Sequence, residues 1–76
     1  MEAILKTTVE SGKWNINSIE NQIKEYAFNN NLEVIQLESV KTDLIMKKLY
    51  INIKGEVSKL EVIKSYLHKI AFDLNN

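Results

Sequence analysis

The sequence contains no cysteine, no proline and no arginine, and it has two glycines and one histidine. The absence of cysteine excludes disulfides, thiolate nucleophiles and cysteine metal sites. The absence of arginine removes the side chain that most often reads guanine edges and phosphates, which argues against sequence-specific DNA binding. The glycines, Gly12 and Gly55, stand far apart, so the chain has no glycine-rich loop that would cradle a phosphate.

Long apolar runs and an excess of one charge are also missing. Ten lysines balance ten acidic residues, and no apolar stretch approaches the roughly 20 residues needed to cross a bilayer. The start, MEAILKTTVESGK, lacks the basic end and the apolar run of a signal peptide. We therefore expect a cytoplasmic protein in which residues 1–76 form a single domain with a small core.

Alternation of apolar and polar residues predicts three strands, over residues 2–10, 32–41 and 44–54. Gly12 breaks the chain after the first strand, and Thr42 and Asp43 suggest a turn between the other two. The adjacent Val34 and Ile35 leave the inward face of the second strand open and suggest a bulge.

Apolar residues at helical spacing predict a helix over residues 16–28, which the asparagines at 29–31 would end. Either Asn15 or Asn17 can cap its start. The Asn15 alternative places Trp14 against Ile19 as a hydrophobic staple. Trp14 is then a lid on the core, and the other interpretation is a binding anchor on a loop.

The sequence VSKLEV at 57–62 predicts the start of a second helix. Ser58 and Glu61 fit a capping box, and Val57 can close on Val62 as a staple. The apolar face that follows consists of Leu60, Ile63, Leu67, Ile70, Ala71 and Leu74.

A shift of 44 residues brings the apolar positions of the two strand–helix units into coincidence. Leu5 then falls on Leu49, and Ile19 falls on Ile63. The predicted fold class is α+β with the order β-α-β-β-α, a three-stranded antiparallel sheet and two helices on one face. This arrangement resembles a ferredoxin-like fold that lacks its fourth strand, and the resemblance implies that the first strand is an exposed edge.

An exposed edge is a row of unpaired N–H and C=O groups, which folded proteins usually pair or cover. Lys6 is the only charged side chain in the middle of this strand that would oppose pairing with another chain. Two copies paired through it would form a homodimer with a six-stranded sheet, and a strand of another protein can dock there instead. If the N–H of Thr7 points outward, proline at that position would block such pairing.

We therefore predict a non-catalytic protein-interaction module, a homodimer that acts as a small regulator, adaptor or inhibitor. The predicted contact residues are Ile4, Lys6 and Thr8 on the first strand. Phe28 and Phe72 join them because they recur at matching positions, away from the apolar stripe of each helix. The alternative is that both aromatics fold back over the edge of the core.

The alternative function is binding of RNA or single-stranded nucleic acid on the open face of the sheet. Tyr50 would stack on bases, with Lys6, Lys48 and Lys54 around it. This loosely resembles RNA-recognition domains, although the first strand supplies no aromatic residue. The same face, with Ile4, Tyr50 and either Val34 or Met46, can equally contact protein.

Catalytic and metal-binding patterns are not found. His68 has no acid or second ligand at a suitable spacing, so we interpret it as a surface residue. The serines lack a nucleophile motif, and the acidic residues are scattered. We expect no enzyme activity, no metal, no cofactor and no membrane partner.

Overall fold

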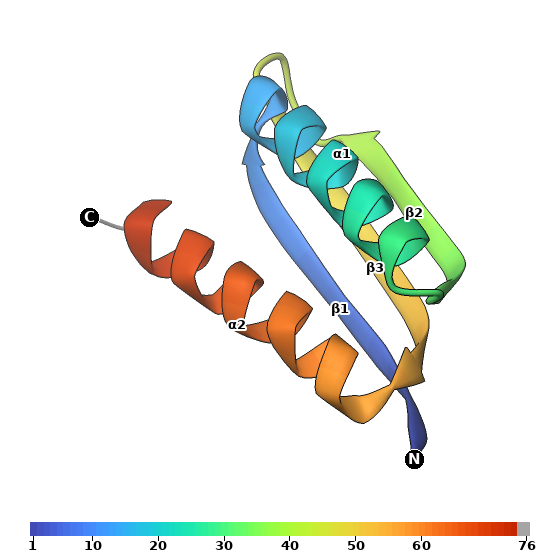
Figure 1. The fold of residues 1–76 in the computed structure, drawn as a ribbon. Helices are drawn as coiled ribbons and strands as arrows, with labels where there is room; N and C mark the ends of the chain where they lie inside the picture. The colour runs from blue at the N-terminus through green and yellow to red at the C-terminus, as the bar shows by residue number, and fades with distance from the viewer. Residues whose placement is uncertain (75–76) are drawn as a thin grey trace.

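The computed structural model describes the backbone of residues 1–74 and the side chains of residues 1–70. The element order is β1 (Glu2–Gly12), α1 (Lys13–Asn29), β2 (Glu33–Lys41), β3 (Met46–Glu56) and α2 (Val57–Leu74). The strand order is β1-β3-β2, and both pairs are antiparallel. Both helices cover one face of the sheet (Figure 1). The predicted α+β fold, ferredoxin-like without a fourth strand, is confirmed.

The core lies between the central strand β3 and the two helices. Leu49, Ile51 and Ile53 alternate along β3 and are buried. Against them pack the helical residues Ile16, Ile19, Ile23, Leu60, Ile63 and Leu67. These are the stripes that the sequence predicts, so the apolar periodicity is sufficient to assign the inner face of each helix. Ala71 and Leu74 lie outside the described side chains.

The start of α1 differs from the prediction. β1 continues to Gly12 and α1 begins at Lys13, so neither asparagine caps the helix, and the cap residue Gly12 makes no side-chain hydrogen bond. The Lys13 N–H instead donates to the carbonyl of Ile45 in the β2–β3 turn, at 2.8 Å. Trp14 is 72% exposed in the first helical turn, so the prediction of a core lid is wrong.

The start of α2 also differs from the prediction. The helix begins at Val57, which places Ser58 inside the first turn rather than before it, where a capping box requires it. The Val57 N–H donates to the Met1 carbonyl at 3.0 Å. At the start of both helices, the first amide donates to a carbonyl distant in the sequence, and the predicted side-chain cap does not precede the helix.

The end of α1 and the bulge in β2 agree with the sequence. Asn31 adopts a left-handed conformation with φ of 57°, and the Leu32 N–H donates to the Ala27 carbonyl at 3.0 Å. The register of β2 shifts between Val34 and Gln36. Val34 is paired with Ile53, so its side chain shares the helix-covered face of the sheet.

A pseudo-twofold axis relates the two strand–helix units that the shift of 44 residues makes equivalent. When a residue contacts its own equivalent, a twofold axis must pass between the two. Two such pairs, each separated by 44 positions, are present: Thr7 lies opposite Ile51, and the Tyr66 hydroxyl bonds to Gln22. The same shift maps the bond from Lys13 to Ile45 onto the bond from Val57 to Met1. The axis therefore passes between β1 and β3 and between the two helices.

Replacing Ile51 with alanine should lower the free energy of unfolding by about 2–5 kcal/mol, because this side chain is 1% exposed at the centre of the core. Chemical denaturation measures the change. Phe28→Ala is the control: Phe28 is 85% exposed, and its loss should change stability by less than about 0.5 kcal/mol. Equal effects of the two substitutions would contradict the described core.

Candidate functional site

The free edge of β1 is the candidate site, and its exposed backbone groups follow from the register. Residues paired between β1 and β3 have numbers that sum to 58, as in Leu5 opposite Ile53. The bonds from Val57 to Met1 and from Lys13 to Ile45 extend this register at both ends. Hydrogen-bonded and non-hydrogen-bonded pairs alternate along an antiparallel ladder. Odd-numbered residues of β1 therefore bond to β3, and even-numbered residues turn their N–H and C=O groups outward.

The three β1 residues predicted as contacts are on this outward-facing set. Ile4, Lys6 and Thr8 present their backbone donors and acceptors to the free edge, and their side chains are exposed on the open face of the sheet. The N–H of Thr7 faces β3 instead. Proline at Thr7 would therefore disrupt the sheet itself, and Thr8 is the position at which proline acts on the edge alone.

A groove runs along this edge beneath α2. Its main part has a volume of about 500 Å³ and extends along residues 4–9 of β1. The α2 side of this part consists of Lys64, Leu67 and His68. A smaller hollow continues the groove toward the start of α2, between Ala3 and the helix residues Val57 and Leu60. The edge is thus open at the level of the strand and roofed by a helix.

The contacts of the helices show why this space exists. α1 packs on all three strands, whereas α2 makes its main contacts with β1 and β3 only. The pseudo-twofold axis exchanges β3 with β1, so it carries β2 onto the outer edge of β1. Within the described part of the chain, the contact that α1 makes with β2 has no counterpart under α2. Leu5, Thr7 and Val9 are accordingly half-buried, while their partners on β3 are fully buried.

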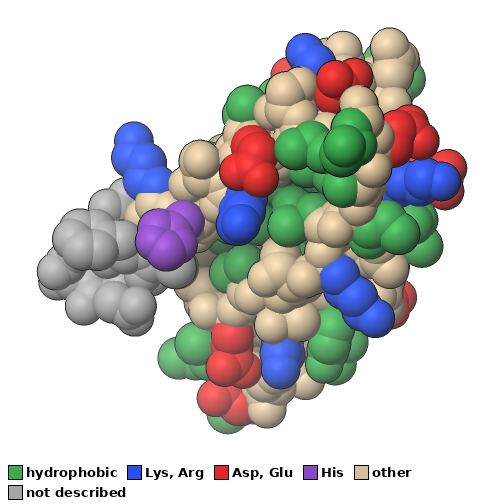
Figure 2. Space-filling model, turned by 90° about the horizontal axis from the view of Figure 1, so that it is seen from below, with side chains coloured by type: hydrophobic (Ala, Val, Ile, Leu, Met, Phe, Trp, Pro, Cys, Tyr) green, Lys and Arg blue, Asp and Glu red, His purple; other side chains and the backbone are tan. Residues whose placement is uncertain are grey.

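The groove is lined by basic and apolar side chains. Lys64 and His68 line its main part on the α2 side, while Lys6 borders it from β1 with its side chain on the open face of the sheet, and no carboxylate among the described residues lines this part. Glu61 lines the hollow near the start of α2. Elsewhere on the surface in Figure 2, Lys and Asp or Glu side chains are interspersed, and His68 (purple) lies near the far end of α2. The groove is therefore suited to an extended segment with acidic and apolar side chains.

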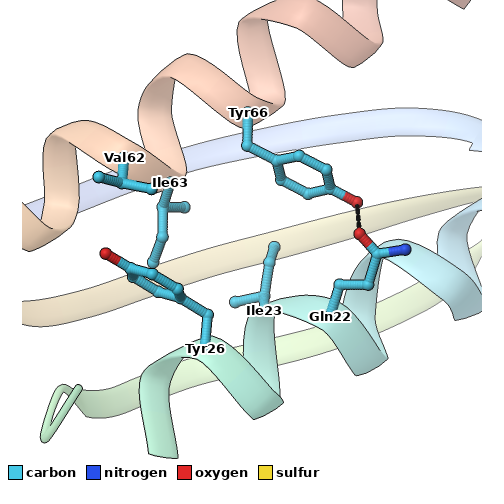
Figure 3. Close-up of a pocket in the computed structure, with 6 residues that line it drawn as sticks. All are labelled: Gln22, Ile23, Tyr26, Val62, Ile63 and Tyr66. Atoms are coloured by element: carbon cyan, nitrogen blue, oxygen red, sulfur yellow. Dashed lines mark hydrogen bonds between the residues drawn. The ribbon is translucent and has the colours of Figure 1, made fainter. Parts of the chain in front are cut away.

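A second hollow, of about 240 Å³, lies between α1 and α2 (Figure 3). The Tyr66 hydroxyl donates to the Gln22 side-chain oxygen, and the Tyr26 hydroxyl donates to the Lys59 carbonyl at 3.3 Å. Burial raises the pKa of Tyr66, which favours the protonated hydroxyl as a donor. The hollow is smaller than a typical ligand pocket, and its tyrosine hydroxyls bond to the protein itself. We interpret it as the seam between the helices.

The open face of the sheet carries mixed charge. Tyr50 lies there with Lys48, whose ammonium is 5.7 Å from the ring centre. Two of the three lysines of the predicted nucleic-acid site have a glutamate opposite them: Glu10 faces Lys48 and Glu33 faces Lys54, whereas Lys6 lies opposite Asn52. Glu38 faces Tyr50. These carboxylates offset part of the positive charge that would attract phosphates to this face.

Of the two remaining predicted contact residues, Phe28 does not line the groove. Phe28 is exposed near the end of α1. The Phe72 side chain lies outside the described residues, so the prediction that pairs it with Phe28 stays a prediction. Among the described residues, no cluster of His, Asp and Glu could hold a metal ion. None of the described helices combines the length and the apolar character needed to cross a bilayer.

Comparisons with models of known protein families, with curated proteins and with solved structures found no match to this chain.

The register predicts an alternating exchange pattern along β1. Amide protons of Leu5, Thr7 and Val9 bond to β3 and should exchange slowly with solvent, whereas those of Ile4, Lys6 and Thr8 should exchange at least about tenfold faster. Hydrogen–deuterium exchange followed by NMR measures both sets in one sample. Protection of the even-numbered set in the isolated chain would mean that the edge is already paired.

Proposed function

We propose that this chain is a non-catalytic protein-interaction module that takes up an extended segment of a partner protein as a fourth strand beside β1. One observation supports the proposal: the unpaired backbone groups of the β1 edge lie along the groove that α2 covers. Backbone hydrogen bonds would supply affinity, and the groove would select the side chains of the incoming strand. Such a module would serve as an adaptor, a regulator or an inhibitor.

The pseudo-twofold axis defines how the segment would lie. β2 is antiparallel to β3, so its counterpart would be antiparallel to β1. Leu37 lies opposite Ile51, and the corresponding apolar residue of the segment would lie opposite Thr7 and point under α2. Glu38 lies opposite Tyr50, and a corresponding acidic residue would face Lys6.

A single strand fits the groove better than the edge-to-edge homodimer that the sequence suggests. Antiparallel pairing of β1 with β1 of a second copy requires a twofold axis perpendicular to the sheet, which keeps all helices on one face. Helices pack about 8–10 Å apart, whereas strands lie about 4.8 Å apart. α2 already extends over the edge, so two copies would bring both α2 helices over one seam. The steric conflict favours a partner that contributes a strand without a helix above it.

A synthetic peptide with the sequence of residues 33–41 is a suitable first probe, because pseudosymmetry makes β2 the best available model of the missing strand. We expect saturable binding, measured by fluorescence anisotropy of the labelled peptide. Thr8→Pro should weaken the binding about tenfold or more, because it removes an outward N–H and adds a ring at the edge.

Thr8→Ala is the matched control, because it removes the same side chain and keeps the N–H; its affinity should stay within about twofold of the unmodified chain. Circular dichroism would verify that both variants fold. Failure of the unmodified chain to bind the peptide, or equal affinities of the two variants, would contradict the proposal. Light scattering of the free chain provides the separate test of the homodimer.

A further inference from the structure

A cluster of exposed apolar side chains lies at the end of the molecule where α1 begins. Trp14 in the first turn of α1 is 72% exposed, and Leu44 and Ile45 in the β2–β3 turn are 81% and 62% exposed. The hydrogen bond from Lys13 to Ile45 holds the turn against the start of the helix, and the two segments lie together at the top of Figure 1. We call these three residues and the turn that carries two of them the apolar tip.

The turn of the apolar tip is hydrogen-bonded internally. One carboxylate oxygen of Asp43 accepts hydrogen bonds from the N–H groups of Ile45 and Met46, each at 2.9 Å. The Thr42 N–H donates to the Met46 carbonyl at 3.0 Å. The turn therefore holds Leu44 and Ile45 outward by its own bonding. These bonds also direct the negative charge nearest the tip toward the backbone of the turn.

Lysines surround the tip. Lys41 and Lys47 are paired directly across the two strands that lead into the turn, and like charges in this position repel each other. Lys13 stands over the Trp14 ring, 4.8 Å from its centre. Lys47 donates to the neutral Asn17 side chain at 3.2 Å. None of these three lysines forms an ion pair with a carboxylate within the described part of the chain.

We propose that the apolar tip docks on an anionic lipid surface. Tryptophan and large aliphatic side chains gain free energy by entering the boundary between headgroups and acyl chains. Each lysine close to an anionic leaflet adds electrostatic attraction, and a negative surface relieves the repulsion between Lys41 and Lys47. The insertion of the apolar side chains and the attraction of the lysines act at the same end of the molecule. The complementarity of charge favours a membrane over a neutral apolar partner.

The tip is separate from the β1 groove, so the two proposals can fail independently. The groove opens along the side of β1 beneath α2, and none of the tip residues lines it. A chain seated on a membrane by the tip would keep this groove accessible to a partner.

Trp14 is the only tryptophan of the chain, so its fluorescence reports on the tip directly. Mixed vesicles of phosphatidylcholine and phosphatidylserine should shift its emission to shorter wavelength and sediment the protein. Vesicles of phosphatidylcholine alone should bind about tenfold more weakly, and added salt should weaken binding to the anionic vesicles.

Two variants separate the apolar contribution to vesicle binding from the electrostatic contribution. The double substitution Leu44→Ser and Ile45→Ser should lower vesicle affinity about tenfold. The double substitution Lys41→Gln and Lys47→Gln should lower affinity for anionic vesicles by a similar factor. Phe28→Ser is the matched control: it removes an exposed apolar side chain about 21 Å along the same helix, and binding should not change.

Absence of binding to anionic vesicles would overturn the proposal, as would unchanged binding by the Leu44 and Ile45 variant. A Trp14 shift that depends on protein concentration without lipid would also overturn it, in favour of a second copy of the chain covering the tip. Vesicle binding that requires both phosphatidylserine and the intact tip is the result that supports it.

Discussion

The difference in width between helices and strands governs this structure. Two helices packed side by side cover about four strands, because helices lie about 8–10 Å apart and strands about 4.8 Å apart. The described sheet has three strands. α1 packs over β1, β2 and β3, so the excess width falls entirely on α2, which overhangs the edge of β1. This mismatch in width explains three features of the β1 edge: the groove, the unpaired backbone groups, and the half-buried state of Leu5, Thr7 and Val9.

The apolar pattern of the sequence was sufficient to predict the element order, the inner faces of both helices and the central strand, because burial in a small core imposes periods of 2 and 3.6 residues. The shift of 44 residues also predicted the similarity of the two strand–helix units. Local capping rules failed at Asn15 and Ser58, because the helices begin at Lys13 and Val57 and both residues lie inside the first turn. The first amides of the two helices bond to the carbonyls of Ile45 and Met1. These acceptors are far away in the sequence, so no local motif marks them.

The candidate site was only partly predictable. The exposed edge and its residues Ile4, Lys6 and Thr8 follow from topology, but the direction of each N–H depends on a register that one residue of slippage would reverse. The groove was not foreseen, because it depends on how far α2 extends beyond β1. The apolar tip is not predictable from the sequence either: the pattern around Trp14 indicates a core residue, because no local motif marks the continuation of β1 to Gly12 and the start of α1 at Lys13.

The central claim is that a strand position stands open under α2. It is tested most directly by supplying that strand within the chain, in a variant where Asn76 is replaced by a second copy of residues 32–41, the segment that follows α1. If the copy fills the groove, the melting temperature should rise by about 5 °C or more, and Thr8→Pro in the same extended chain should remove the gain. An unchanged melting temperature, or a gain that survives Thr8→Pro, would contradict the account.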